Sequence, residues 1–343
     1  MMATVGMHAE LDSIAQIEFP GFLDLQVNGF GGVDFNNPAT TNRDVGQAVQ
    51  AMRTTGVTRL LPTLITSPFE RFAQCARTLA RAGLPEIFGI HMEGPYICPD
   101  AGARGAHPRE HAIPASIEDF ARRQDAADGR ILLVTLAPDV PGALPLIEHL
   151  VDLGIRVAIG HTAASPEQIR DAVTAGATLS THMGNGCAHS LPRHPNFIWE
   201  QLATDELFAS LIVDGHHLPA ATVKAMVRAK TAERVFLVTD AVAAAGCAPG
   251  TYELNGERVV SGEDGRVSPV GKPWLAGSTL TMSQAVGNTV KFTGLPLETV
   301  LAMASTLPAK YLGIEPVGTV TANWNASRCR LSNIQAPTIL KGN

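Results

Sequence analysis

Four polar residues come at or just past the ends of short apolar runs, and together their side chains could form a hydrolytic metal centre. These residues are Glu93, His161, His182 and Asp240. A buried parallel strand reads as a continuous apolar stretch, and in a closed α/β barrel the catalytic side chains lie where the strands end. Two imidazoles and two carboxylates in such places indicate one metal site.

Glu93, His161 and His182 form a three-ligand set that leaves one coordination position open for water. An open position is typical of catalytic metals. Taken singly, each histidine could be a hydrogen-bonded barrel residue, and Glu93 could be a surface charge. Three such residues at matching strand ends favour the metal site, so we predict that these side chains are the ligands.

Asp240 follows the last apolar run and would lie across the barrel mouth from the predicted ligands. A metal lowers the pKa of bound water, so a nearby carboxylate can take the proton and later deliver it to a leaving group. We predict that Asp240 is this general base and acid. It could instead be a fourth ligand or a helix cap before residues 241–245.

The end of the first apolar run indicates a single metal. Barrel hydrolases with two metals usually have His-x-His there, whereas this chain has Gln26 and Asn28. Neutral amides are poor ligands for transition metals, but they can hydrogen-bond a polar substrate or the water. We therefore expect one divalent ion. The ligand set accepts several, so we name Zn²⁺ first, with Fe²⁺, Mn²⁺ or Co²⁺ as alternatives.

Eight apolar runs alternate with segments of helical periodicity, and this alternation predicts an α/β fold, a (β/α)8 barrel of the TIM type. The runs span residues 22–27, 57–65, 87–92, 131–136, 155–159, 177–182, 208–213 and 235–239. An open, doubly wound sheet is the alternative fold. No G-x-G-x-x-G motif follows the first run, which disfavours it.

Capping signals mark where the intervening helices begin and end. Ser67 and Ser165 each precede a proline and stand three residues before Glu or Gln, which predicts a capping box, and Ser116 carries a weaker version of the signal. Glycines just before the next run are typical of helix ends. They are Gly56, Gly83, Gly154 and Gly176.

The pattern changes after the last run. Asn255-Gly256 and Asp264-Gly265 are turn signals that predict a β insertion at about residues 249–275, near the barrel mouth. Helical periodicity returns at 278–292 and 296–312. We expect the barrel to span 20–313. We expect residues 1–19 and 314–343 to form the remnant of a small β domain.

Composition excludes several classes of protein. The 343-residue chain has a net charge of -6 with 17% charged residues, so it offers no basic surface for nucleic acid. Its five cysteines include no C-x-x-C pair, which disfavours a zinc ribbon or a disulfide framework and fits a reducing cytoplasm. No signal peptide or membrane-spanning stretch is apparent. We predict a soluble cytoplasmic protein without a membrane partner.

A series of short motifs runs through the predicted barrel. They are residues 20–29 (PGFLDLQVNG), 91–95 (HMEGP), 160–162 (GHT), 181–185 (THMGN), 214–217 (DGHH), 238–241 (VTDA) and 275–278 (LAGS). In this order, they resemble the N-acetylglucosamine-6-phosphate deacetylase family of the amidohydrolase superfamily. The resemblance implies an enzyme that removes acetate from N-acetylglucosamine 6-phosphate to give glucosamine 6-phosphate.

The resemblance also implies roles for individual residues. It assigns the metal ligands and the general base as above, and it implies that His107 helps to hold the acetyl carbonyl and could stabilise the developing oxyanion. Arg193 and His217 match phosphate-binding positions, one of them supplied by a neighbouring subunit, which implies a homodimer. From the residues alone, Arg193 could be a solvated surface charge, and His216 or His217 a core histidine. Other positions match contacts to the phosphosugar, namely Ala106, Asn185 and Gly186.

The chain departs from the family pattern in two places. Asn185-Gly186-Cys187 stands where the family commonly has Asn-Ala-Met, a change that could alter how the sugar packs. The segments before Pro20 and around Trp324 also differ from the family's usual small domain. We therefore expect that domain to be reduced or rearranged, with consequences for stability or assembly more than for chemistry.

Three other functions remain open at this point. The substrate could be another N-acetylhexosamine phosphate, such as the galactosamine compound. Glu93 and Asp240 could instead be the two carboxylates of a glycosidase. The chain could also be a non-catalytic sugar-phosphate binding protein, although a full set of ligand and acid-base residues weighs against that.

Overall fold

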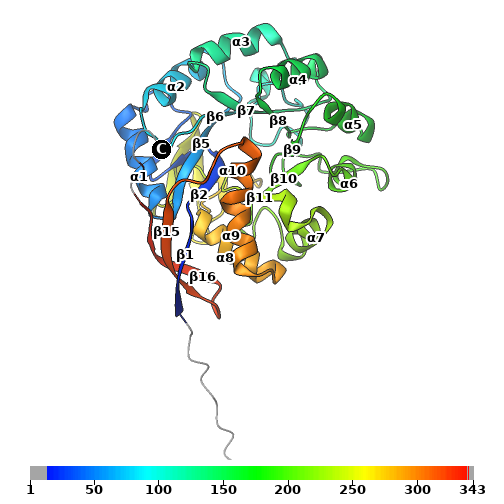
Figure 1. Cartoon of the computed structure of the whole chain (residues 1–343). Helices are drawn as coiled ribbons and strands as arrows, with labels where there is room; N and C mark the ends of the chain where they lie inside the picture. The colour runs from blue at the N-terminus through cyan, green and yellow to red at the C-terminus, as the bar shows by residue number, and fades with distance from the viewer. Residues whose placement is uncertain (1–13, 338, 340–343) are drawn as a thin grey trace, which may run out of the picture.

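Eight parallel strands form one sheet at the centre of the molecule, in the order β2-β5-β6-β7-β8-β9-β10-β11 (Figure 1). The structure is a computed structural model that describes residues 14–337 and residue 339. The strands are β2 (Phe22–Val27), β5 (Val57–Ile65), β6 (Ile90–Glu93), β7 (Ile131–Leu136), β8 (Arg156–Ile159), β9 (Leu179–Ser180), β10 (Phe208–Leu211) and β11 (Val235–Leu237).

The sheet closes into a barrel at the carboxyl ends of its first and last strands. Val27 forms a parallel bridge with Ala241, and the backbone N–H of Asp240 donates to the carbonyl of Gln26 at 2.9 Å. Strands β2, β5 and β7 have the predicted bounds, whereas β9 and β11 end before the predicted residues. The predicted TIM-type barrel is confirmed, and the open sheet is wrong.

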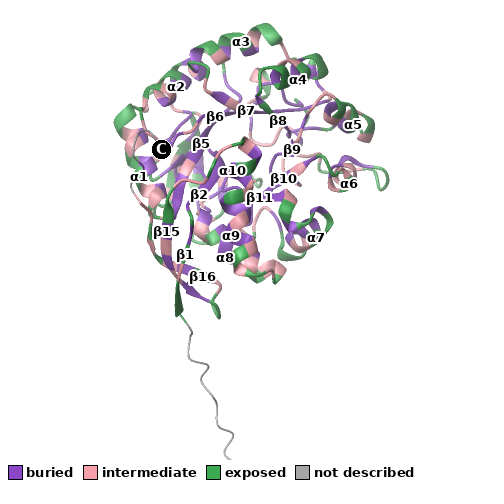
Figure 2. Cartoon of the chain, viewed as in Figure 1, coloured by how far each residue is buried: buried purple, intermediate pink, exposed green. Residues whose placement is uncertain are grey.

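Among the described residues, ten α-helices surround the barrel, and their buried faces point toward the strands in Figure 2. They are α1 (Asn42–Arg53), α2 (Phe69–Arg81), α3 (Ile117–Ala126), α4 (Ala143–Asp152), α5 (Pro166–Thr174), α6 (Phe197–Ala203), α7 (Ala220–Lys230), α8 (Met282–Thr293), α9 (Leu297–Ala304) and α10 (Thr306–Leu312). Two short 3-10 helices are η1 (Arg109–His111) and η2 (Ala232–Arg234).

Two of the three predicted helix caps are confirmed. Ser165 forms a capping box with Gln168, and the Ser116 hydroxyl accepts from a backbone N–H in the first turn of α3. The cap at Ser67 is wrong, because Pro68 takes the N-cap position of α2 in extended backbone and no side chain caps that helix. The glycines predicted at helix ends, Gly56, Gly83, Gly154 and Gly176, all have a positive φ, as such ends favour.

The predicted β insertion is an antiparallel sheet of β12 (Gly250–Leu254), β13 (Glu257–Ser261) and β14 (Val267–Pro269). Asn255 and Gly256, with φ of 51° and 86°, form the turn of its first hairpin. Val259 and Val267 belong to an apolar cluster that includes Ile65, the last residue of β5. The insertion therefore packs against the mouth end of the barrel.

The chain ends form a second small sheet of β1 (Ile14–Pro20), β15 (Thr319–Asn325) and β16 (Arg330–Gln335), beside the barrel in Figure 1. This sheet confirms that a small β unit is built from the chain ends. The predicted extents of 1–19 and 314–343 stay a prediction, and residues 1–13, 338 and 340–343 lie outside the described residues.

Within the described ranges, none of the helices combines the length and the apolar character that crossing a membrane would require. All five cysteines are free thiols.

Phe22 joins the barrel to the small sheet. Its ring is fully buried at the start of β2, and it stacks on Phe19 of β1 with 4.9 Å between ring centroids. Truncating a buried phenylalanine removes apolar contact and leaves a cavity, so we expect Phe22→Ala to lower the free energy of unfolding by about 3–5 kcal/mol. Denaturant unfolding would measure this. Phe88→Ala, at a half-buried ring, is the control, and an equal loss in both variants would contradict the prediction.

Candidate active site

The three predicted ligands meet at the carboxyl ends of their strands. Glu93 ends β6, while His161 and His182 follow β8 and β9. The Oε1 atom of Glu93 lies 3.2 Å from His161 Nε2 and 2.9 Å from His182 Nε2, and the two Nε2 atoms are 3.0 Å apart. All three residues are buried. Segments far apart in the sequence therefore bring one carboxylate oxygen and two imidazole nitrogens to one point.

The backbone at three of the four residues lies in the left-handed region. The φ angles are 49° at His161, 30° at His182 and 47° at Asp240. Residues other than glycine seldom adopt this region, and such strain is concentrated at functional sites. These left-handed residues come two to three positions after the ends of β8, β9 and β11. No sequence signal such as Gly or Asn marks them.

The ligand set fits a divalent transition metal. Tetrahedral coordination at about 2.0–2.1 Å separates ligand atoms by about 3.3 Å, close to the separations within this group. Nδ1 of His161 lies 3.0 Å from the carbonyl oxygen of Ala103. A proton held there leaves the Nε2 lone pair free for a metal, as is usual for ligating histidines. Burial raises the pKa of Glu93, but hydrogen bonds from His161 and His182 outweigh burial and hold that pKa well below its usual range.

Asp240 lies beside this group and is held by two amides. Its Oδ1 accepts from Asn28 Nδ2 at 2.7 Å and from Gln26 Nε2 at 3.3 Å, and the same Gln26 nitrogen donates to Glu93 Oε1 at 2.9 Å. Burial, reinforced by the charge of Glu93, raises the pKa of Asp240 to about 6. A carboxyl group with that pKa can both accept and return a proton near neutral pH. Residues 241–245 form no helix, so the helix-cap alternative for Asp240 is wrong.

His107 stands at the edge of the ligand group. Its Nε2 lies 3.8 Å from Glu93 Oε2, and its ring centroid is 4.2 Å from that of His161. Its Nδ1 is 2.8 Å from the Thr66 hydroxyl. Burial lowers the pKa of His107 well below its usual range, which favours the neutral ring. A neutral imidazole here can donate one hydrogen bond and accept another.

A cavity of about 470 Å³ lies at the ligand group, and most of the predicted site residues line it. It is lined by the predicted residues Asn28, Glu93, Ala106, His107, His161, His182, Asn185, Gly186, His217 and Asp240. Gln26 is buried but does not line the cavity, and Arg193 is exposed on the loop before α6. A single chain therefore does not bring Arg193 to the cavity.

Other residues line the cavity that no motif had indicated. Trp274 stands next to the LAGS motif and is 44% exposed, and Arg104 precedes His107 by three residues. Both are sequence neighbours of matched motifs, which is the signal that could have found them. Gly186 lies so close to the imidazole of His161 that a Cβ at this position would be 2.8 Å from Nδ1. The glycine thus leaves room for the ligand ring.

The two candidate histidines after β10 have different environments. His217 lines the cavity, and its Nδ1 lies 2.6 Å from Asp214 Oδ2. His216 instead has its Nε2 2.8 Å from the carbonyl oxygen of Asp264 in the insertion. Burial raises the pKa of Asp214, but the side-chain hydrogen bond and charge of His217, together with backbone N–H donors of His216 and His217, lower that pKa overall. Of the two, His217 is placed to meet a ligand in the cavity.

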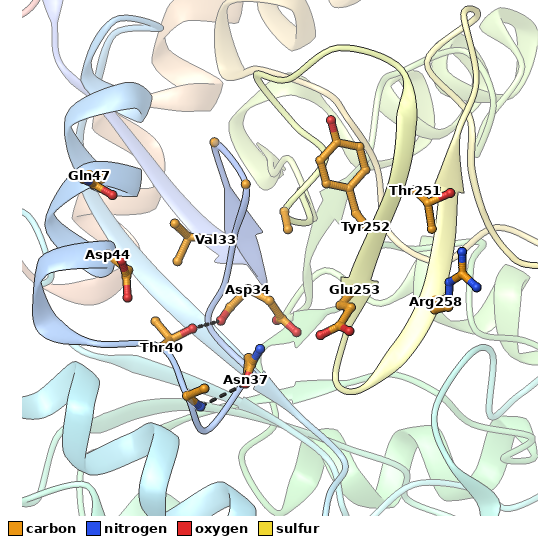
Figure 3. A pocket seen from close by; sticks show the side chains of 14 residues that line it. Val33, Asp34, Asn37, Thr40, Asp44, Gln47, Thr251, Tyr252, Glu253 and Arg258 are labelled. Carbon is orange, nitrogen blue, oxygen red and sulfur yellow. Dashed lines mark hydrogen bonds between the residues drawn. The ribbon is translucent and has the colours of Figure 1, made fainter.

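A second cavity, of about 740 Å³, lies outside the barrel mouth between α1 and the insertion (Figure 3). It is bordered by the short hairpin of β3 (Gly29–Phe30) and β4 (Val33–Asp34) and by β12 and β13. Its lining includes Asp34, Glu253 and Arg258, and none of the predicted site residues. The chemistry predicted from the sequence therefore belongs to the smaller cavity.

Comparison with known proteins places the chain in a family. The sequence pattern of the amidohydrolase family matches residues 17–327. The chain is 30% identical to the N-acetylglucosamine-6-phosphate deacetylase of Lysinibacillus sphaericus, over 95% of this chain and 85% of the relative. It is 35% identical to the N-acetylgalactosamine-6-phosphate deacetylase of Escherichia coli O157:H7, over 88% of this chain and 80% of the relative.

A solved structure shares the fold closely. It is a variant of the N-acetyl-D-glucosamine-6-phosphate deacetylase of Mycobacterium smegmatis in complex with N-acetyl-D-glucosamine-6-phosphate. The TM-score is 0.86 at 31% identity, covering 94% of this chain and 86% of the other. The family pattern spans nearly the whole described chain, including every residue of the buried Glu-His-His group. The chain belongs to the amidohydrolase family.

Proposed function

We propose that the protein hydrolyses the N-acetyl group of N-acetylglucosamine 6-phosphate, giving glucosamine 6-phosphate and acetate. The observation that carries the proposal is the convergence of Glu93, His161, His182 and Asp240 on one cavity of about 470 Å³. Relatives named N-acetylglucosamine-6-phosphate deacetylase match most of this chain, and this similarity supports the choice of substrate. A metal-free glycosidase is disfavoured, because the Oε1 atom of Glu93 faces two imidazoles.

One divalent ion per chain would be held by Glu93, His161 and His182, with Zn²⁺ as our first choice and Fe²⁺, Mn²⁺ or Co²⁺ as alternatives. When bound, such an ion lowers the pKa of a water molecule and polarises a carbonyl group. Gln26 and Asn28 stand where a second metal would need ligands, and their amides instead hydrogen-bond Glu93 and Asp240. This arrangement supports a one-metal site.

Asp240 moves the proton in the proposed reaction. The Asp240 carboxylate, held in place by Asn28, takes a proton from the attacking water while the new C–O bond forms at the acetyl carbon. His107 donates a hydrogen bond to the acetyl oxygen, where negative charge develops. The C–N bond then breaks, and Asp240 returns its proton to the departing nitrogen. Acetate and the free amine are the products.

The phosphate and the sugar would be bound by other residues that line the same cavity. These residues are Ala106, Asn185, Gly186 and His217. Arg193 is exposed outside the cavity of its own chain, and we propose that it completes the phosphate site of a second copy. This makes the enzyme a homodimer. Arg193→Ala should then weaken binding of the phosphosugar.

N-acetylgalactosamine 6-phosphate is the second candidate substrate. The chain is 35% identical to a relative named for that sugar, and it is also 35% identical to a relative named for the glucosamine compound. The two sugars differ only in the orientation of one hydroxyl group, so both belong in the assay. A cytoplasmic location stays a prediction.

Removing the His217 imidazole should separate phosphate recognition from chemistry. A hydrogen bond to a charged group contributes about 1.5–3 kcal/mol, so His217→Ala should raise KM for the 6-phosphosugar about 10–100-fold. The value of kcat should change much less. Steady-state kinetics would measure both, with unphosphorylated N-acetylglucosamine as the control substrate. A similar loss on the control substrate would mean that His217 does not bind the phosphate.

Acetate release by the purified protein tests the proposed function. N-acetylglucosamine 6-phosphate and its galactosamine isomer would each be supplied, with Zn²⁺, Fe²⁺, Mn²⁺ or Co²⁺ added in turn. We expect acetate and free amine in equal amounts from at least the glucosamine compound. Absence of acetate with every metal would reject the proposal, and release from the galactosamine compound alone would favour the second candidate.

A further inference from the structure

The hydroxyl of Thr66 makes one polar contact, and that contact is with His107. Thr66 directly follows β5 and is fully buried. Its Oγ1 lies 2.8 Å from His107 Nδ1. In the described part of the chain, this hydroxyl makes no other hydrogen bond. The contact therefore decides where both groups carry their protons.

A buried hydroxyl needs an acceptor for its proton, because leaving it unpaired costs about 1–3 kcal/mol. For the Thr66 hydroxyl, the acceptor within hydrogen-bond distance is Nδ1 of His107. A nitrogen that accepts cannot carry a proton, so the proton of the neutral ring is on Nε2. We infer that Thr66 holds His107 in the Nε2-protonated form, which makes Thr66 a positioning residue for the hydrogen bond that His107 donates into the cavity.

The Nε2-protonated form of His107 matters for the proposed deacetylation. The catalytic role inferred for Thr66 rests on that proposed function. The acetyl oxygen of the substrate has lone pairs only, so it can be stabilised by a donor and is repelled by an acceptor. With the proton on Nε2, the edge of His107 that faces Glu93 and the cavity is a donor. With the proton on Nδ1, that edge would be an acceptor. Thr66 thus selects the form that can contribute to catalysis.

Thr66 is itself fixed by the β insertion. The side chain of Asn255, in the turn between β12 and β13, donates from Nδ2 to the Thr66 carbonyl at 3.1 Å. The backbone N–H of Asn255 donates to Asp34 Oδ2 at 2.8 Å. Asp34 is the last residue of β4, and Figure 3 shows it beside the insertion strands. The hairpin turn is thereby tied to the segment that presents the hydroxyl.

Gly94 leaves the space that the hydroxyl occupies. A Cβ at Gly94 would lie 2.1 Å from Thr66 Oγ1, and the φ of Gly94 is +76°. Glycine is therefore required at this position on both steric and conformational grounds. Contacts from the insertion and from the β6 end together leave Thr66 Oγ1 facing Nδ1 of His107.

Kinetics of matched variants test the positioning role. Thr66→Val keeps the shape of the side chain and removes the hydroxyl, so we expect kcat to fall about 10–100-fold, with a smaller change in KM. Thr66→Ser restores a hydroxyl and should recover most of kcat. Thr289→Val is the control, because Thr289 is equally buried but its hydroxyl donates to Ala285 in α8. A kcat for Thr66→Val equal to that of Thr289→Val would overturn the inference.

The protonation of His107 can be observed without substrate. Two-bond ¹H–¹⁵N correlation spectra of Zn²⁺-loaded protein distinguish the two neutral forms, and His107→Gln would assign the signals. We expect a neutral ring with its proton on Nε2 in the wild type and in Thr66→Ser. A proton on Nδ1, or on both nitrogens, would overturn the inference. If no sugar phosphate is hydrolysed, the proposed function fails, but this spectrum still decides whether Thr66 fixes the ring.

Discussion

Replacing Asp240 with asparagine is expected to lower kcat by about 10²–10⁴-fold, the range typical of a lost general base and acid. The substitution leaves the surroundings intact. An asparagine Oδ1 can still accept from Asn28 Nδ2 and Gln26 Nε2, and asparagine tolerates the left-handed backbone of this position, where φ is 47°. What the variant lacks is a group that can take a proton from water. The bound metal should remain, since Asp240 is outside the ligand group.

Asp128→Asn is the matched control for this variant. Asp128 has nearly the same left-handed backbone, with φ of 50°, but lies exposed in the turn before β7. Its substitution should leave kcat unchanged. Acetate release and metal content would be measured for both variants. If Asp240→Asn kept wild-type activity, Asp240 would not be the proton carrier, and the non-catalytic alternative would gain support.

Removing a ligand should abolish both metal binding and activity. In His182→Asn, the Glu93 oxygen keeps only one imidazole partner, and a neutral amide is a poor replacement ligand for a transition metal. Lewis-acid catalysis contributes several kcal/mol, and each 1.36 kcal/mol is a factor of ten, so kcat/KM should fall by about 10³-fold or more. Asparagine again suits the left-handed backbone, where φ is 30°.

Metal content separates this effect from misfolding. The wild type and His149→Asn, at a half-buried histidine on α4, should each hold one ion per chain, whereas His182→Asn should hold much less. Circular dichroism would show whether the variant is folded. A folded His182→Asn protein with a full complement of metal would mean that the ion is bound elsewhere.

The barrel could be predicted because its strands are buried on both faces. Such strands read as continuous apolar runs, and β2, β5 and β7 have the predicted bounds. The strand ends at the site were less predictable. His161 and His182 adopt left-handed backbone without a glycine to signal it, and this strain is maintained by tertiary contacts.

The ligand group was predictable from position alone, since the carboxyl ends of barrel strands share one face. The hydrogen-bonding partners of the ligand residues and of their neighbours could not be predicted in this way. Gln26 binds both Glu93 and Asp240, a contact that depends on the closure of the barrel between its first and last strands. Thr66 meets His107 across 41 positions of sequence. Contacts of this kind depend on side-chain packing between distant segments, which no local pattern encodes.

Bound metal and acetate release should be measured on the same preparation of wild-type protein. We predict one divalent ion per chain and hydrolysis of N-acetylglucosamine 6-phosphate. Chelation should remove both the ion and the activity, and restoring the ion should restore acetate release. Full activity in chelated protein shown to hold no metal would contradict these predictions, as would a stoichiometric ion in protein that hydrolyses neither hexosamine phosphate.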